Sequence, residues 1–194
     1  MSTRNPLDKK VLRYAYANGY FPMPDPDTGE ILWYQPNPRA VIPLEQFHAA
    51  RSLRRTKRRD SYRVSRDEAF ADVMRGCAER PDTWITEEFM SAYTALHDDG
   101  DAHSVEVWDG DRLVGGLYGV AIGGAFFAES KFHRVTDASK LALWHLVDHM
   151  RATGMTLLEV QFITPHLASL GATLISHEEY MEKLAAAIRQ KISF

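Results

Sequence analysis

The sequence predicts an α+β fold, in which helices and an antiparallel sheet occupy separate stretches of the chain. Between residues 65 and 97 the apolar side chains recur at the spacing of amphipathic helices. From residue 104 the pattern changes to short strands separated by glycine-containing turns. With 194 residues, 45% of them hydrophobic, the chain is long enough for one large domain or for a core domain with a small annex.

The N-terminal part is expected to hold one short helix followed by an extended segment. The helix is predicted over residues 8–18, where Asn18-Gly19 provides a C-terminal stop. Prolines concentrate between residues 22 and 43, which predicts turns and extended backbone. We therefore expect a small N-terminal domain, residues 1–43, and a larger domain, residues 44–194.

Three helices are expected next. The first starts near Leu44 and continues into a basic run. Ser65-Arg66-Asp67-Glu68 has the pattern of a capping box and would open the second, and Thr86 would cap the third. The residues expected on their buried faces are Phe70, Val73, Met74 and Cys77 in the second helix and Phe89, Tyr93 and Leu96 in the third.

A meander of three strands follows, joined by two tight turns. The expected strands are residues 104–108, 113–121 and 125–132, and the turns are Asp109-Gly110-Asp111 and Gly123-Gly124. Asp137 would then cap a helix with Leu143, Leu146, Val147 and Met150 on one face, and residues 157–162 would form a fourth strand. Three strands, a helix and a strand is an order close to that of acetyltransferase cores.

Composition limits the possible partners and cofactors. The net charge of −3 means that an anionic partner must be held by a local patch. The start of the chain lacks an apolar signal-peptide region, and residues 119–128 are too few and too glycine-rich to span a bilayer, so we expect a soluble, unexported protein. Cys77 is the only cysteine, which excludes an internal disulfide.

The densest charged feature is a run of six cations within nine residues: Arg51, Arg54, Arg55, Lys57, Arg58 and Arg59. At helical spacing Arg51, Arg54, Arg55 and Arg58 share one face. Two interpretations are open: a solvated helix face, or a surface that follows a nucleic-acid backbone through its phosphates without reading bases.

Short motifs along the chain resemble a known family. They are, in order, Asn18-Gly19-Tyr20-Phe21-Pro22, Trp84-Ile85-Thr86, His103-Ser104-Val105-Glu106-Val107-Trp108, Leu113-Val114-Gly115-Gly116-Leu117-Tyr118-Gly119, Glu129-Ser130-Lys131-Phe132, Ala138-Ser139-Lys140 and His166-Leu167-Ala168-Ser169-Leu170-Gly171-Ala172. They resemble the leucyl/phenylalanyl-tRNA–protein transferases, which move an amino acid from a charged tRNA to a protein's N-terminus. The resemblance covers nearly the whole chain.

The resemblance implies a fold and an activity. The fold would be an acetyltransferase-like (GNAT-like) domain behind a smaller N-terminal one. The enzyme would transfer Leu or Phe, and to some extent Met, from aminoacyl-tRNA to the α-amine of proteins that begin with Arg or Lys, marking them for degradation. No metal or organic cofactor is implied. The partners would include neither membrane nor DNA, and the location would be the cytoplasm.

Three polar residues are implied as the catalytic group: Glu159, Gln161 and Glu129. Glu159 and Gln161 are two apart on a predicted strand, so their side chains are expected on one face. By pattern alone they could be a hydrogen-bonded structural pair. The family motif is Asp-x-Gln, and this chain has one methylene more. Glu129, beside aromatic residues, must meet a cation or a donor if buried, and the resemblance places it at the aminoacyl-adenosine end.

The resemblance also implies binding residues for the donor. Trp84 would contact the adenosine end, and Met23 stands where the family commonly has Trp. Lys131 stands where Met is familiar. The pocket for the Leu or Phe side chain would be formed by Leu117, Phe126, Leu143 and Leu146, and the basic face of Arg51, Arg54, Arg55 and Arg58 would bind tRNA.

Two other functions are weighed against this one. A GNAT-type N-acetyltransferase should carry a glycine-rich pyrophosphate turn of the form Gln-x-x-Gly-x-Gly/Ala, which the sequence lacks. A non-catalytic tRNA- or peptide-binding homologue could have kept the pocket and lost turnover through Glu159 and Met23. His145 and His149 are spaced for a metal, but no third ligand stands nearby in sequence.

Overall fold

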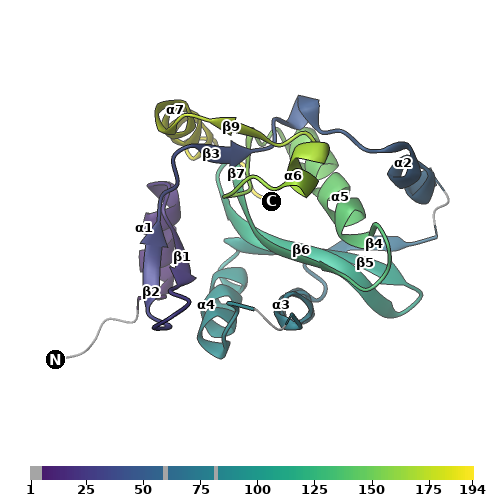
Figure 1. The fold of residues 1–194 in the computed structure, drawn as a ribbon, viewed down its shortest axis with the longest axis horizontal. Helices are drawn as coiled ribbons and strands as arrows, with labels where there is room; N and C mark the ends of the chain where they lie inside the picture. Colours follow the sequence, from purple (N-terminus) through teal and green to yellow (C-terminus); the bar gives the residue numbers. More distant parts are fainter. Residues whose placement is uncertain (1–5, 59–60, 81–82) are drawn as a thin grey trace.

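The computed structural model describes residues 6–58, 61–80 and 83–194. These residues form a mixed α/β structure with a two-stranded and a seven-stranded sheet (Figure 1). The prediction of an α+β fold is confirmed at this level.

The N-terminal helix and the small sheet lie together at one end of the molecule (Figure 1). Helix α1 (Lys9–Ala17) begins after Asp8, whose carboxylate accepts a hydrogen bond from the backbone N–H of Lys10. It ends at Asn18-Gly19, where Gly19 has a φ of 78°, as the sequence predicts. The small sheet pairs β1 (Phe21–Pro24) antiparallel with β2 (Ile31–Tyr34).

The large sheet has the strand order β4-β5-β6-β7-β8-β3-β9. Its strands are β3 (Arg39–Val41), β4 (Arg63–Arg66), β5 (Ala102–Asp109), β6 (Arg112–Ile122), β7 (Ala125–His133), β8 (Leu157–Glu159) and β9 (Thr173–Ile175). The predicted meander is β5-β6-β7, and its turns hold Gly110 and Gly123 at positive φ. The β7–β8 pair is parallel.

Strand β3 belongs to this large sheet although it precedes residue 43. It pairs antiparallel with β8 on one side and with β9 on the other. The segment after the small sheet therefore enters the large sheet, next to β8. The division into domains 1–43 and 44–194 stays a prediction.

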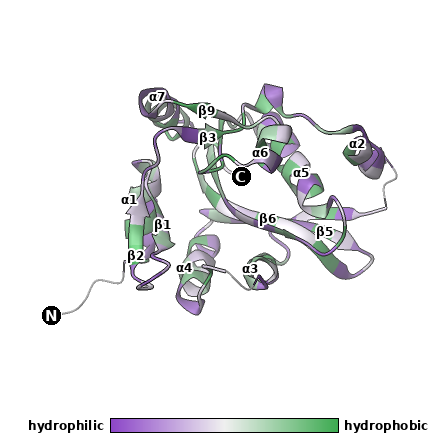
Figure 2. Cartoon of the chain, viewed as in Figure 1, coloured by the Kyte–Doolittle hydropathy of each residue, from purple (hydrophilic) through white to green (hydrophobic). Residues whose placement is uncertain are grey.

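Helices cover both faces of the large sheet (Figure 1). On one face lie α3 (Phe70–Ala78) and α4 (Glu87–Asp98), and on the other lies α5 (Ala138–Thr153). The remaining helices are η1 (Leu44–Gln46), α2 (Arg51–Arg58), α6 (Pro165–Ser169) and α7 (His177–Ala187). Buried residues form two clusters, one on each face of the sheet. Figure 2 shows hydrophilic residues on the outer side of α4 and hydrophobic ones along the strands.

Most predicted helix features are confirmed. Thr86 caps α4, since its hydroxyl accepts from the N–H of Phe89. The predicted apolar faces of α3, α4 and α5 are buried, including Cys77, which is fully enclosed. Helix α5 does begin after Asp137, but this residue has a φ of 68° and its carboxylate accepts from the Lys140 ammonium (2.8 Å) instead of capping the helix.

The predicted capping box at Ser65 is wrong. Ser65 lies in β4, and its hydroxyl donates to Glu106 on β5 (2.6 Å). Helix α3 begins after Ala69 with no side-chain cap. The carboxylate of Asp67 instead accepts from the N–H of Ser104 on β5 (2.8 Å). Pairing of this segment with β5 takes up the groups that would have capped the helix.

Two predicted boundaries also differ. The helix expected from Leu44 into the basic run is split into η1 and α2, and between them the N–H of His48 donates to the carbonyl of Leu170 (3.0 Å). The strand expected over 157–162 ends at Glu159, because Gln161 has a φ of 61°. Gln161 therefore does not share a strand face with Glu159.

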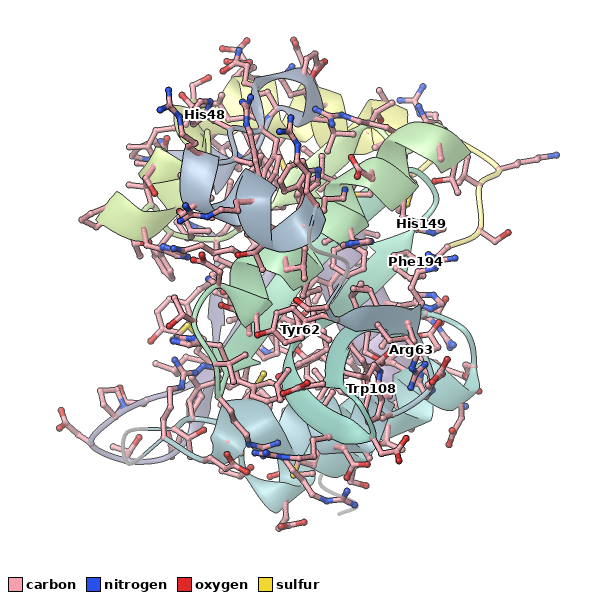
Figure 3. The ribbon with its side chains drawn as sticks, turned by 90° about the vertical axis from the view of Figure 1, so that its right-hand side faces the viewer. His48, Tyr62, Arg63, Trp108, His149 and Phe194 are labelled. Atoms are coloured by element: carbon pink, nitrogen blue, oxygen red, sulfur yellow. The ribbon has the colours of Figure 1, made fainter. Side chains whose placement is uncertain are left out.

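Phe194 packs between β5 and α5 (Figure 3). Its ring stacks on His103 of β5 at 4.3 Å between centroids and meets His149 of α5 edge-on at 4.5 Å. The C-terminal segment is thereby held against the large sheet.

Candidate active site

The candidate site is organised by a bulge in β7. Tyr118 of β6 faces Ser130 and the next residue, Gly119, faces Ala128, which leaves Glu129 as the extra residue. A bulge re-aims the side chain of its extra residue and is common beside active sites. Gly119 permits it, because a Cβ there would collide with the carbonyl oxygen of Phe127.

Glu129 is buried and receives three hydrogen bonds. Tyr16 of α1 donates to its Oε1 (2.6 Å), Gln161 Nε2 donates to the same oxygen (3.1 Å), and Tyr93 of α4 donates to Oε2 (3.4 Å). The two phenol oxygens are also hydrogen-bonded to each other. Burial raises the pKa of Glu129 to about 8, against the lowering effect of Tyr16. The sequence-based expectation of donors around a buried Glu129 is confirmed.

Glu159 is also buried, and its charge is balanced by Arg39 of β3. Arg39 Nη1 donates to Glu159 Oε1 (3.1 Å), and Arg39 Nη2 donates to the carbonyl of Gly19 (2.5 Å). The guanidinium lies over the ring of Tyr180 at 4.3 Å. Burial raises the pKa of Glu159, and the charge of Arg39 opposes this.

Gln161 joins the two carboxyl groups. Its backbone N–H donates to Glu159 Oε1 (2.7 Å), and its side-chain amide donates to Glu129. The left-handed backbone at Gln161 lets both bonds form at once. The three residues singled out as catalytic therefore lie in one hydrogen-bonded network, although the expected shared strand face is wrong.

Two pockets meet at residues 129–131. The larger has a volume of about 750 Å³, and its walls include Arg80, Trp84, Lys140 and His166. The smaller, about 200 Å³, is walled mainly by apolar side chains: Leu117, Ala128, Leu143, Val160, Phe162 and Leu167. Glu129, Ser130 and Lys131 line both pockets.

The predicted binding residues fall in different places. Leu117 and Leu143 line the smaller pocket and Trp84 lines the larger. Phe126 and Leu146 are fully buried in the adjoining core cluster and do not line the smaller pocket. Met23 is half-buried in β1 and packs on the other core cluster, and neither of the two pockets described above includes it.

Sequence reasoning missed Arg39, Tyr16 and Tyr93 as members of the network. A signal for the two tyrosines exists, because a phenol on the buried face of a helix needs a hydrogen-bond partner. A signal for Arg39 is weaker: an acid within an apolar strand requires a cation, but nothing in the sequence says which one.

The basic helix α2 lies at the end of the molecule opposite α1, β1 and β2 (Figure 1), and Figure 3 looks onto that end. Leu53 anchors it in the core, while Arg51, Arg54, Arg55 and Arg58 are exposed. Lys57 is engaged with Asp148 and with the ring of Trp144 on α5. A shallow cavity of about 450 Å³ beside the helix is lined by Arg54, Lys57, Arg58 and Arg151 with Phe47, Ala49 and Trp144. Arg59 lies outside the described residues.

Comparison with known proteins settles the family. The sequence profile described as "Leucyl/phenylalanyl-tRNA protein transferase" matches residues 41–185, and the profile of that family's N-terminal domain matches residues 5–37. The chain belongs to the leucyl/phenylalanyl-tRNA protein transferase family. The family predicted from the motifs is thereby confirmed, and with it the prediction of an aminoacyltransferase.

Two relatives that carry the family's name align with this chain along most of their own length. The chain is 51% identical over 189 residues to a leucyl/phenylalanyl-tRNA–protein transferase of Ruegeria sp. (strain TM1040), covering 97% of this chain and 90% of that protein. It is 49% identical to the transferase of Herpetosiphon aurantiacus, covering 97% and 98%. The crystal structure of FemX is 14% identical with a TM-score of 0.54 over 86% of this chain and 66% of that one, a likeness of fold alone.

Neither a membrane-spanning helix nor a metal-binding cluster is found among the described residues. No helix among them has the length and apolarity to cross a membrane. Within the same residues no group of three or more His, Cys, Asp or Glu is arranged to hold a metal ion.

Proposed function

We propose that this chain transfers Leu or Phe, and Met to a lesser extent, from charged tRNA to the α-amine of proteins that begin with Arg or Lys. The observation that carries the detail is the network of Glu129, Gln161 and Glu159 at the junction of an apolar and a polar pocket. The product would be a substrate for degradation. The cytoplasm is the expected location, because charged tRNA and nascent proteins meet there.

The two pockets divide the donor between them. The smaller pocket, lined by Leu117 and Leu143, would take the amino-acid side chain. The larger pocket would take the terminal adenosine, with Trp84 stacking on the base. Phe126 and Leu146 would shape the smaller pocket from beneath. This arrangement sets the ester at Glu129–Lys131, where the pockets meet.

The chemistry needs little beyond positioning. The ester of aminoacyl-tRNA is already activated, so the enzyme must bring ester and amine together, remove a proton from the ammonium and stabilise the tetrahedral oxyanion. Gln161 would orient the amine through its side-chain amide. None of these three tasks requires a metal or an organic cofactor.

The two carboxyl groups would have different tasks. Glu159, held by Arg39, would fix the backbone of Gln161 and balance positive charge that develops near it. Glu129, with a pKa of about 8, is largely a neutral acid at pH 7, so it can donate as well as accept a hydrogen bond toward the adenosine side. Glu159 would thus act through Gln161, and Glu129 directly on the donor.

Transfer assays distinguish this function from the two alternatives. The protein is incubated with leucyl-, phenylalanyl-, methionyl- and lysyl-tRNA and a peptide beginning with Arg, and transfer of labelled amino acid is followed. We expect transfer from the first three. Transfer of acetyl from acetyl-CoA instead would establish the N-acetyltransferase. Binding of charged tRNA without any transfer would establish the non-catalytic homologue.

On the fold, we propose the GNAT-like assignment for residues 44–194, with residues 1–43 as the smaller domain. The order β5-β6-β7-α5-β8, the parallel β7–β8 pair and the bulge beside it support this assignment. Limited proteolysis that releases residues 44–194 as a folded unit would test the boundary.

A further inference from the structure

The larger pocket has an unbalanced positive wall. Of its cations, Lys140 is paired with Asp137 (2.8 Å). Among the residues that the structure describes, Arg80 donates only to neutral groups, Ser130 Oγ (3.3 Å) and the carbonyl of Cys77 (3.4 Å). Lys131 has no hydrogen-bond or ion-pair partner within the part of the chain that the structure describes.

The acids of this pocket do not compensate for Arg80 and Lys131. Glu79 is paired with Arg134, and Glu129 is largely neutral at pH 7 because burial raises its pKa to about 8. The wall therefore carries a positive charge that a bound anion would balance.

Lys131 stands where the two pockets join. It pairs with Leu117 across the sheet and lines both the apolar and the polar pocket. A lysine in such a place lays its apolar stem along the apolar wall and extends its ammonium toward the polar space. Burial lowers the pKa of Lys131, and the nearby charge of Arg80 lowers it further, so an anion bound beside both cations would favour the charged ammonium. The pKa of His166 is lowered mainly by burial, and the positive charges of Lys131 and Lys140 lower it further.

The positive charge of this pocket wall favours the donor over the acceptor as the substrate that it contacts. The acceptor brings a cationic α-ammonium and a cationic Arg or Lys side chain, and Lys131 and Arg80 repel both. The donor brings phosphates. If the amino-acid side chain occupies the smaller pocket and the adenosine the larger, the phosphate on the adenosine's 5′ oxygen is the nearest anion to this wall.

We propose that Lys131, assisted by Arg80, binds the phosphodiester that links the 3′-terminal adenosine of the donor tRNA to the preceding nucleotide. This inference rests on the proposed function. Lys131 would then be a donor-positioning residue close to the ester, separate from the contacts of α2.

The exchange Lys131→Met removes the charge and keeps an unbranched apolar stem, so it is the informative variant. Two donors differ only in one phosphate: 3′-O-leucyl-adenosine and 3′-O-leucyl-adenosine 5′-monophosphate. In the parent protein, with a peptide beginning with Arg as acceptor, we expect kcat/KM to be about tenfold or more higher for the phosphorylated donor, the size of a charge-assisted hydrogen bond. In Lys131→Met this ratio should fall close to one, through KM.

A matched control makes the same exchange on an exposed helix surface. Lys10→Met on α1 should retain the parent's donor ratio. Thermal melting of both variants confirms that they are folded. If Lys131→Met lowers kcat equally with both donors, the ammonium acts on the ester and not on the phosphate, and the proposal is overturned. A ratio that stays at the parent's value in Lys131→Met overturns it as well.

Calorimetry separates this inference from the proposed function. We expect the parent to bind adenosine 5′-monophosphate more tightly than adenosine, with a difference that shrinks as salt is added and disappears in Lys131→Met. Absence of transfer together with this binding difference would overturn the function and support the phosphate site. If the parent binds adenosine 5′-monophosphate and adenosine with equal affinity, the phosphate site is overturned, whether or not transfer occurs.

Discussion

Arg39 and Glu159 form an ion pair in which each side chain is only 1% exposed, and they come from strands separated by 120 residues in the chain. Arg39 leads from the small N-terminal sheet into the large one, and Glu159 ends the strand next to it. Because Glu159 also accepts the N–H of Gln161, the pair connects the joining of the two sheets to the geometry of the candidate active site.

Removal of one partner of this pair should be more harmful than removal of both. Arg39→Met leaves the Glu159 carboxylate buried without a cation, and we expect a loss of about 3–5 kcal/mol in the free energy of unfolding. The double variant Arg39→Met/Glu159→Met should lose less than the single one. Urea denaturation of these two variants and of Glu159→Met measures the three losses, and a double loss equal to the sum of the two single losses would show that the residues do not interact.

Stability should fall as pH rises through the range set by Glu129. Its pKa is about 8 in the folded protein against an ordinary 4.5, so the folded state binds the proton more strongly. Its contribution is fully present below pH 4.5 and is lost between there and pH 8, at up to about 1.4 kcal/mol per pH unit. Glu129→Gln should flatten this slope in denaturation curves recorded from pH 5 to 9. A slope unchanged by the substitution would mean that Glu129 ionises normally.

Removal of the Gln161 side chain should reduce turnover strongly and donor binding only slightly. Gln161→Ala should lower kcat by roughly tenfold to a thousandfold, the range of a lost polarising or acid–base group, with little change in donor affinity. Glu159→Asp, which shortens the side chain by one methylene, should keep partial activity, because the carboxylate still faces Arg39. Full activity in Gln161→Ala at saturating donor would remove this residue from the mechanism.

The smaller pocket should select donors by shape. Leu, Met and Phe should all be transferred, since a missing methylene discriminates by only about 1–3 kcal/mol, and charged or β-branched donors should be poor. Leu143→Ala enlarges the pocket and should shift the ratio of kcat/KM from leucyl toward phenylalanyl donors. Leu146→Ala, a turn further along α5 and fully buried in the core, should destabilise the fold with a smaller shift in this ratio. Equal shifts would mean that both residues contact the donor.

The basic helix should contribute affinity for tRNA and not chemistry. Reversal of Arg54, Arg55 and Arg58 to Glu should weaken binding of charged tRNA and reduce its salt dependence, because phosphate contacts release counterions. Transfer from leucyl-adenosine should change little. The matched control reverses Lys183, Arg189 and Lys191, three exposed cations on and after α7, for the same change in net charge. Equal loss with tRNA and with leucyl-adenosine would instead make α2 part of the catalytic structure.

Local patterns were enough to predict the three-strand meander, the helices that follow Thr86 and Asp137, and the family. Glycines at Gly110 and Gly123, where φ is positive, end the strands of the meander, and Thr86 and Asn18-Gly19 mark helix ends, because these signals act within a few residues. The same local reasoning failed where a distant strand competed for the group. Ser65 was predicted as a helix cap and instead donates to Glu106 of β5, 41 residues away.

The sequence by itself was enough to determine the family and, through that resemblance, to single out Glu129, Glu159 and Gln161 as the proposed catalytic residues. Only the tertiary structure decided how they are held. The bulge at Glu129 and the left-handed backbone at Gln161 aim their side chains, and Arg39 and Tyr16 reach them from 120 and 113 residues away. Pairings of this kind depend on chain closure and on burial, which remove charged and polar groups from water and make partners obligatory, and neither leaves a local pattern in the sequence.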